Sequence, residues 1–175
     1  MNLEQLKTEL PDYAKDIKVN LGSVLTETGA PGLTQKQLTS IALASAYASR
    51  NPDVIAALTQ FASSELSTDE INAVKAAATI MAMNNIYYRF THSMSDESYA
   101  SMPASLRMTV MANPALDKIS FELSSVAVSA INGCAKCMNA HAAQLEKHGV
   151  SKQAIQSAVR IASVINAAAI AREIA

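Results

Sequence analysis

The only two cysteines of the chain lie three positions apart in the stretch INGCAKCMNAH, residues 131–141, and a histidine follows the second by four positions. Helical spacing puts Cys134, Cys137 and His141 on one face of a helix that starts just after Gly133. The unpaired amides and the dipole at a helix start lower the pKa of a cysteine there and favour the thiolate. A nearby histidine can exchange protons near neutral pH. The pattern predicts thiol–disulfide chemistry.

A carboxylate on the preceding predicted helix is the fourth candidate. Glu122 lies on an apolar stripe, three residues after Ile119 and four before Val126. We expect it to be partly buried and to need a partner, because burial of an unpaired carboxylate costs several kcal/mol. His141 is a suitable partner, since a carboxylate on one imidazole nitrogen fixes the tautomer and orients the other nitrogen toward the thiols.

Two other interpretations of these residues stay open. The four side chains have ligand types that bind zinc, although structural zinc sites usually combine two separated pairs of ligands. The cysteines can also be small core residues, because a C-x-x-C spacing arises easily by chance. We expect His92 and His148 to be solvated or to cap helices. Flexible methionine side chains often fill gaps in a core, and this is expected for Met81, Met83, Met94, Met102, Met108 and Met111.

The elements that must position the site are all helices. Alanine- and leucine-rich segments have apolar residues at three- and four-residue spacing, and only 5 Gly and 5 Pro interrupt them. Helix starts are indicated by capping boxes at Thr34 and Ser67, by Asn-Pro pairs at Asn51 and Asn113, and by the Gly149-Val-Ser sequence. The predicted helices cover residues 12–26, 35–49, 52–65, 68–90, 114–131, 135–148 and 152–172.

The chain also shows a weak internal repeat. A shift of 84 positions lays residues 43–58 over 127–142 and residues 66–74 over 150–158 with a similar helical pattern. The shift lays Arg50 over Cys134, Asp53 over Cys137, Ala57 over His141 and Leu38 over Glu122. We therefore expect an all-α, duplicated helical fold in one domain, residues 1–175. Its degenerate half would cover about 12–90 and its active half about 114–175.

Composition excludes several classes of function. The net charge is −1 with charges of both signs mixed along the chain, so nucleic acid and membrane surfaces are not expected partners. The charged N-terminal segment does not resemble a secretory signal, and the apolar run between Arg160 and Arg172 is too short to span a bilayer. We expect a cytoplasmic protein, in which close cysteines serve redox chemistry or metal binding rather than a structural framework.

The pattern E-x11-C-x-x-C-x3-H, formed by the four candidate residues, resembles the alkyl hydroperoxide reductase D (AhpD) family, a helical group related to the carboxymuconolactone decarboxylases. The resemblance covers essentially the whole chain and includes the stretches NNIYYRF (84–90), LRMTVMANP (106–114) and FELSSVAVSAINGCAKCMNAH (121–141). It implies an all-α homotrimer with antioxidant activity, in which the dithiol cycles through a disulfide.

The resemblance also implies a role for each site residue. Cys137 would be the more exposed thiol, attacking peroxide and forming the mixed disulfide with the partner peroxiredoxin AhpC. Cys134 would be deeper, donating a proton and closing the Cys134–Cys137 disulfide, while Glu122 and His141 would relay protons. No cofactor would be bound. Electrons would come from dihydrolipoamide on an acyltransferase subunit, recycled by dihydrolipoamide dehydrogenase with NADH as the distant source.

One departure from the family pattern lies between the cysteines. Many members have a second histidine where this chain has Lys136. We expect Lys136 to be exposed, with a positive charge that adds to the stabilisation of a thiolate. The departure leaves the thiol pair intact and affects the proton transfer or hydrogen bonding that the second histidine supplies.

Overall fold

The computed structural model describes all 175 residues, and its regular structure is entirely helical. The all-α prediction is confirmed. In chain order the helices are α1 (Leu3–Glu9), the 3₁₀ helix η1 (Asp12–Ala14), α2 (Lys15–Val24), α3 (Gln35–Ser49), α4 (Pro52–Ala62), α5 (Thr68–Ser93), α6 (Ser98–Ser101), the 3₁₀ helix η2 (Thr109–Met111), α7 (Lys118–Ile131), α8 (Ala135–Lys147) and α9 (Lys152–Glu173).

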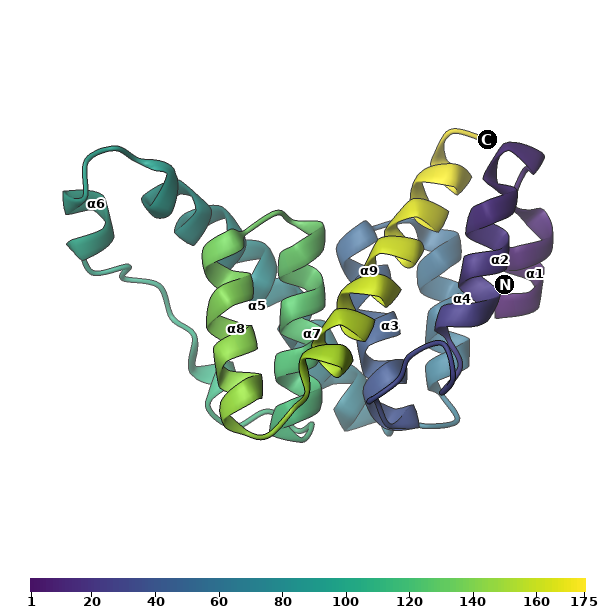
Figure 1. Ribbon diagram of the computed structural model, residues 1–175, viewed down its shortest axis with the longest axis horizontal. Helices are drawn as coiled ribbons and strands as arrows, with labels where there is room; N and C mark the ends of the chain where they lie inside the picture. The colour runs from purple at the N-terminus through teal and green to yellow at the C-terminus, as the bar shows by residue number, and fades with distance from the viewer.

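Three helices, α3, α7 and α9, pack against one another at the centre of the molecule. Helices α5 and α8 cover α7 on one side. At the other end, near both termini, α2 and α4 pack against α9 and α3, and α1 packs against α2 and α4 (Figure 1). Helices α3 and α7 are mostly buried, and their small serine and alanine residues allow close approach. Helix α7 is thus part of the core, and α8 packs against it.

Most of the predicted helix starts are confirmed by side-chain caps. Thr34 and Ser67 form complete capping boxes with Gln37 and Glu70. Asn51 accepts hydrogen bonds from the amides of Asp53 and Val54, with Pro52 in the first helical position. Ser151 caps α9 after Gly149, whose φ of 80° ends α8 in the left-handed region.

One predicted helix start is wrong, and one helix was not predicted. The Asn113-Pro114 pair does not start α7, because Asp117 is the cap and accepts a hydrogen bond of 2.9 Å from the amide of Ser120. The first helix, α1, was not predicted, although Asn2 and Gln5 form a capping box at its start. The predicted helix over 12–26 is η1 followed by α2, which ends at Val24.

The caps define the relation between the two halves more sharply than the sequence does. Thr34 and Asp117 are 83 positions apart, as are Asn51 and Cys134, whereas Ser67 and Ser151 are 84 apart. A shift of 84 positions thus aligns α5 with α9. A shift of 83 positions aligns α3 with α7 and α4 with α8. Equivalent caps support the expected duplication, which stays a prediction together with the single-domain boundaries.

The segment between the halves extends away from the helical body. It runs from the end of α5 through α6 and η2 to α7, and α6 is the part farthest from the body (Figure 1). The methionine prediction is wrong for Met94 and Met102, which are exposed, whereas Met108 is partly buried and Met111 is partly buried and packs against the core. Of the six methionines expected in the core, only Met81 is buried.

Helix α9 is longer than the apolar run considered in the sequence. By length and composition it is able to cross a membrane, yet 56% of its apolar window is buried inside the protein. It packs against α2, α3 and α7, so its apolar character is explained by its place in the core.

Candidate active site

Cys134 and Cys137 are joined as a disulfide at the start of α8, with their Cα atoms 5.3 Å apart. Cys134 is the N-cap of α8, and its Sγ accepts a hydrogen bond of 3.3 Å from the amide of Cys137. The turn before it contains Gly133 with a φ of 69°. The predicted position of both sulfurs at a helix start is confirmed. An unpaired helix amide thus stabilises negative charge on Cys134 when the disulfide opens.

The two sulfurs differ in their access to solvent. Cys134 is fully buried, while Cys137 is 6% exposed and lines a pocket of about 240 Å³. The pocket is mostly apolar, and its lining comes from α5, from the segment before α7 and from α8: Met81, Asn84, Tyr88, Met108, Met111, Lys136, Cys137, Ala140 and His141. Of the two sulfurs, only that of Cys137 is therefore accessible from the pocket.

Glu122 and His141 form the expected pair. The Oε2 atom of Glu122 lies 2.7 Å from Nδ1 of His141, and the side chains are 15% and 9% exposed. The expectation that the other imidazole nitrogen faces the thiols is wrong in this structure, because Nε2 lies 3.1 Å from Sδ of Met81. The ring still borders the pocket beside Cys137.

All four predicted site residues are brought together, but their geometry is not that of a metal centre. No group of three or more His, Cys, Asp or Glu side chains is arranged to hold a metal ion. Both nitrogens of His141 point to other partners. The zinc interpretation receives no support from this arrangement.

Sequence reasoning missed the residues that α5 contributes to the pocket. Met81, Asn84 and Tyr88 lie on one face of α5, more than forty positions before the cysteines. Asn84 is the first residue of NNIYYRF, a stretch used for the resemblance, but the spacing along the chain gave no reason to connect it with the thiols. Lys136 is exposed as expected, lines the pocket and forms no ion pair.

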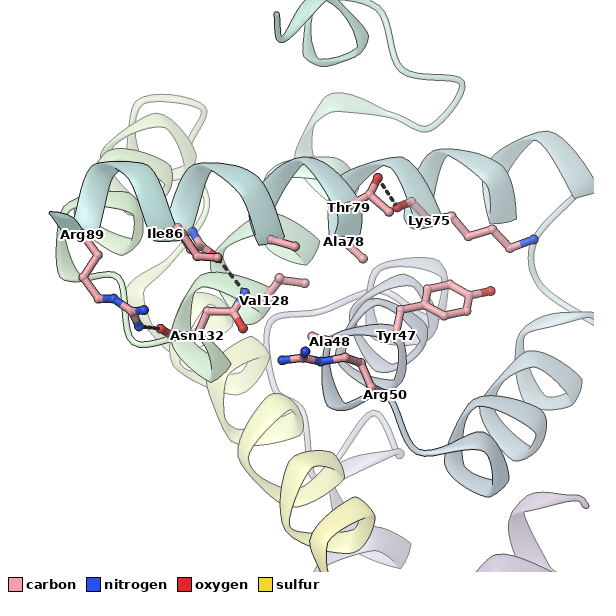
Figure 2. Close-up of a pocket in the computed structure, with 12 residues that line it drawn as sticks. Tyr47, Ala48, Arg50, Lys75, Ala78, Thr79, Ile86, Arg89, Val128 and Asn132 are labelled. Carbon is pink, nitrogen blue, oxygen red and sulfur yellow. Dashed lines mark hydrogen bonds between the residues drawn. The ribbon is translucent and has the colours of Figure 1, made fainter. Parts of the chain in front are cut away.

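A larger pocket of about 730 Å³ lies on a different face of α5 and contains neither cysteine (Figure 2). Arg89 reaches from α5 to the carbonyl of Asn132 at 2.6 Å, as Figure 2 shows. The side chain of Asn132 donates to Asn85, which in turn donates to Ser129, both at 2.9 Å. The Cys134 amide donates to the Ser129 carbonyl at 3.0 Å. This network fixes the turn before Cys134, whereas Cys137 is accessible only from the smaller pocket.

The fold and the site define an all-helical protein with a C-x-x-C disulfide at a helix start beside a carboxylate–imidazole pair. The sequence profile of the carboxymuconolactone decarboxylase family matches residues 97–175. Three proteins named "Alkyl hydroperoxide reductase AhpD" are similar over nearly the full length. The protein from Coxiella burnetii (strain RSA 493 / Nine Mile phase I) is 54% identical over 164 residues, which cover 94% of this chain and 93% of the relative.

The relative from Hyphomonas neptunium is 52% identical over 169 residues, or 97% of this chain and 92% of its own. The relative from Brucella abortus (strain 2308) is 50% identical over 175 residues, which cover 100% of this chain and 98% of the relative. The chain belongs to the alkyl hydroperoxide reductase D (AhpD) family.

Proposed function

We propose that the protein is a thiol–disulfide oxidoreductase that reduces alkyl hydroperoxides at the Cys134–Cys137 pair. The observation that carries this proposal is the asymmetry of the two sulfurs: one borders an apolar pocket and the other is buried at the helix start. The names of the relatives agree with it.

In the reductive half of the cycle, a dithiol opens the disulfide. One substrate thiolate attacks Sγ of Cys137, and the bond to Cys134 breaks, leaving Cys134 as a thiolate held by the Cys137 amide. The second substrate thiol then attacks the mixed disulfide, which closes the substrate disulfide and releases Cys137. Two electrons and two protons pass from the dithiol to the protein.

In the oxidative half, the Cys137 thiolate attacks the terminal oxygen of R–O–O–H. The O–O bond breaks, Cys137 becomes a sulfenic acid, and the alkoxide takes a proton to leave as ROH. Cys134 then attacks Sγ of Cys137, the S–O bond breaks, and the hydroxide takes a proton to leave as water. The disulfide is restored, so the cycle balances.

Glu122 and His141 are the proposed proton carriers of both halves. Their hydrogen bond orients the imidazole at the pocket wall, within the same space as Cys137. Lys136 adds positive charge at the pocket and favours the thiolate there.

The proposed reductant is dihydrolipoamide carried on an acyltransferase subunit and recycled by dihydrolipoamide dehydrogenase with NADH, and no cofactor is bound. The proposed acceptor is the peroxiredoxin AhpC, reached through a mixed disulfide at Cys137. A mostly apolar pocket lined by this cysteine is compatible with an alkyl dithiol chain.

The proposed assembly is a cytoplasmic homotrimer. Apolar side chains at the end of α5 and on the extended segment, Ile86, Phe90, Met94, Met102 and Val110, are exposed in the single chain. Burial of such surface between copies would stabilise an oligomer.

The test is a coupled assay with lipoamide, dihydrolipoamide dehydrogenase and NADH, run with tert-butyl hydroperoxide, with and without AhpC. Wild-type protein is expected to consume NADH, and Cys137→Ser is expected to reduce the rate to background while the circular dichroism spectrum is unchanged. Full turnover by Cys137→Ser would refute the assigned nucleophile. Turnover that requires AhpC would restrict the protein to electron transfer.

A further inference from the structure

Asn84 has a buried side chain with half of its amide unused. The residue is 5% exposed, and its Oδ1 is one of two buried side-chain polar atoms in the protein without a hydrogen-bond partner, the other being Oγ of Ser120. Its Nδ2 has only a weak acceptor, Sδ of Met111 at 3.8 Å. A buried acceptor without a donor lowers stability, so its presence needs a reason other than folding.

The position of Asn84 supplies that reason. Asn84 lines the same small pocket as Cys137 and His141, and its backbone carbonyl lies 4.0 Å from Sγ of Cys137. The neighbouring polar groups do not satisfy its oxygen: Lys136 carries donors but makes no hydrogen bond to it, and both nitrogens of His141 have partners. Asn84 therefore brings an unpartnered acceptor to the wall of the pocket that also contains the accessible sulfur, and this oxygen is itself covered in the disulfide form.

We propose that Oδ1 of Asn84 accepts the hydrogen bond of the hydroperoxide O–H and thereby aims the terminal oxygen at Cys137. This inference rests on the proposed function. A hydroperoxide has one donor, on the oxygen that is attacked, and its alkyl part fits against the methionine side chains of the wall. Such a ligand matches both the acceptor and the apolar lining.

The hydrogen bond persists through the reaction. The Cys137 thiolate forms a bond to the terminal oxygen, the O–O bond breaks, and the alkoxide takes a proton from the Glu122–His141 pair. The terminal oxygen keeps its own proton, so the sulfenic acid S–O–H still donates to Asn84. When Cys134 closes the disulfide and water leaves, the acceptor loses its donor. The disulfide form is the state in which Oδ1 is unpartnered.

The test compares two reactions of the reduced protein in Asn84→Leu and Asn84→Ala. These variants change side-chain volume in opposite directions, and both lack the acceptor. The second-order rate constant with tert-butyl hydroperoxide, measured by stopped-flow loss of thiols, is expected to fall about tenfold in both, the effect of one lost hydrogen bond. The rate with an aromatic disulfide, 5,5′-dithiobis(2-nitrobenzoate), is expected to stay within about twofold, because this reagent brings no O–H.

The neighbouring residue provides a matched control for folding. Asn85 is also buried, but both ends of its amide are used, by Ser129 and Asn132. Asn85→Leu is expected to lower the melting temperature, whereas Asn84→Leu is expected to leave it unchanged or raise it. A lower melting temperature for Asn84→Leu would show a structural role and overturn the proposal.

The remaining outcomes separate this inference from the function. Wild-type peroxide rates in both Asn84 variants, or equal losses with peroxide and disulfide, would overturn the role of Asn84 alone. A wild-type protein that reacts with the disulfide but not with the hydroperoxide would refute the peroxidase step itself, and the role of Asn84 with it.

Discussion

The turn between α3 and α4 and the turn between α7 and α8 share two backbone features but differ in their chemistry. Each has a residue in the left-handed region followed by an N-cap, with φ values of 62° at Arg50 and 69° at Gly133. Asn51 caps the first helix and Cys134 the second, and each accepts a hydrogen bond from the amide three residues on. Asparagine is a preferred cap and cysteine is not. The second turn thus accepts a weaker cap and gains a reactive sulfur.

The same difference extends to the rest of the site. With the shift of 83 that the caps define, Val54, Leu58 and Thr39 correspond to Cys137, His141 and Glu122. All three are fully buried in the first half. In the first half, packed side chains occupy the positions that correspond to the disulfide and to the proposed proton carriers of the second half. If the two halves are duplicates, one has kept a core at these positions and the other has gained the proposed site.

The largest expected effect comes from giving the second half the residues of the first. The double substitution His141→Leu with Glu122→Thr removes both members of the pair, so no buried charge is left unpaired. Peroxide turnover is expected to fall about 100-fold, the typical contribution of a positioned proton carrier, while the protein stays folded. Steady-state rates and circular dichroism measure this. Turnover near the wild-type level would remove the pair from the mechanism.

A smaller effect is expected from exchanging the caps. Asn51→Ala is expected to lower the free energy of unfolding by about 1–2 kcal/mol, since it leaves the α4 amides without an acceptor. Under reducing conditions, Cys134→Ser is expected to raise the free energy of unfolding by about 0.5 kcal/mol relative to wild type, because serine is a better cap of nearly the same size. Urea unfolding with a reductant measures both.

A lower free energy of unfolding for Cys134→Ser than for wild type in reductant would mean that the cysteine sulfur is an adequate cap. The cysteine would then cost the fold no stability. The prediction for Asn51 has its own control, Asn51→Ser, which keeps a cap oxygen and is expected to recover most of the loss.

These comparisons also show what sequence can reveal. Helix starts and the grouping of Cys134, Cys137 and His141 follow from local rules, namely caps and helical spacing. Glu122 was found because a charge on an apolar stripe needs a partner. Asn84 and the methionines of the pocket were not found, since their contact with Cys137 depends on how α5 and the extended segment fold back onto α8. The misplaced start of α7 has a local cause: two cap signals compete within five residues, and Asp117 has the hydrogen bond.

The residues with positive φ in the two turns, Arg50 and Gly133, give predictions of opposite sign for the free energy of unfolding. Arg50→Gly is expected to raise the free energy of unfolding by roughly 0.5–1 kcal/mol, because only glycine adopts this conformation without strain. Gly133→Ala is expected to lower it by about 1 kcal/mol. An added Cβ at Gly133 meets no atom closer than Arg89 Nη1 at 4.0 Å, so the loss measures the backbone alone. Equal stability of Gly133→Ala and wild type would mean that the turn changes conformation.

The smallest expected effect concerns the starts of α5 and α9. Ser67 and Ser151 are equivalent caps, but only α5 has an acidic partner, Glu70, in its capping box. In α9 the same position is Ala154, whose Cβ would lie 3.0 Å from a Cβ at Gly32, so the close packing there leaves no room for a longer side chain. The second half gives up this stabilisation to pack α9 closely.

The contribution of Glu70 depends on pH in a defined direction. Its hydrogen bond with Lys36, at 2.6 Å, and the amide of Ser67, at 2.9 Å, lower the pKa of Glu70 below its ordinary value of 4.5. A carboxyl with a lowered folded-state pKa stabilises the fold above its ordinary pKa, and this stabilisation is lost as the pH falls through the folded-state value. Glu70→Gln is therefore expected to be slightly less stable than wild type at pH 7, and the difference is expected to shrink below pH 4.5. Urea unfolding at a series of pH values measures it. A difference that stays constant down to pH 2 would assign the effect to packing, because the carboxylate is then protonated in both states.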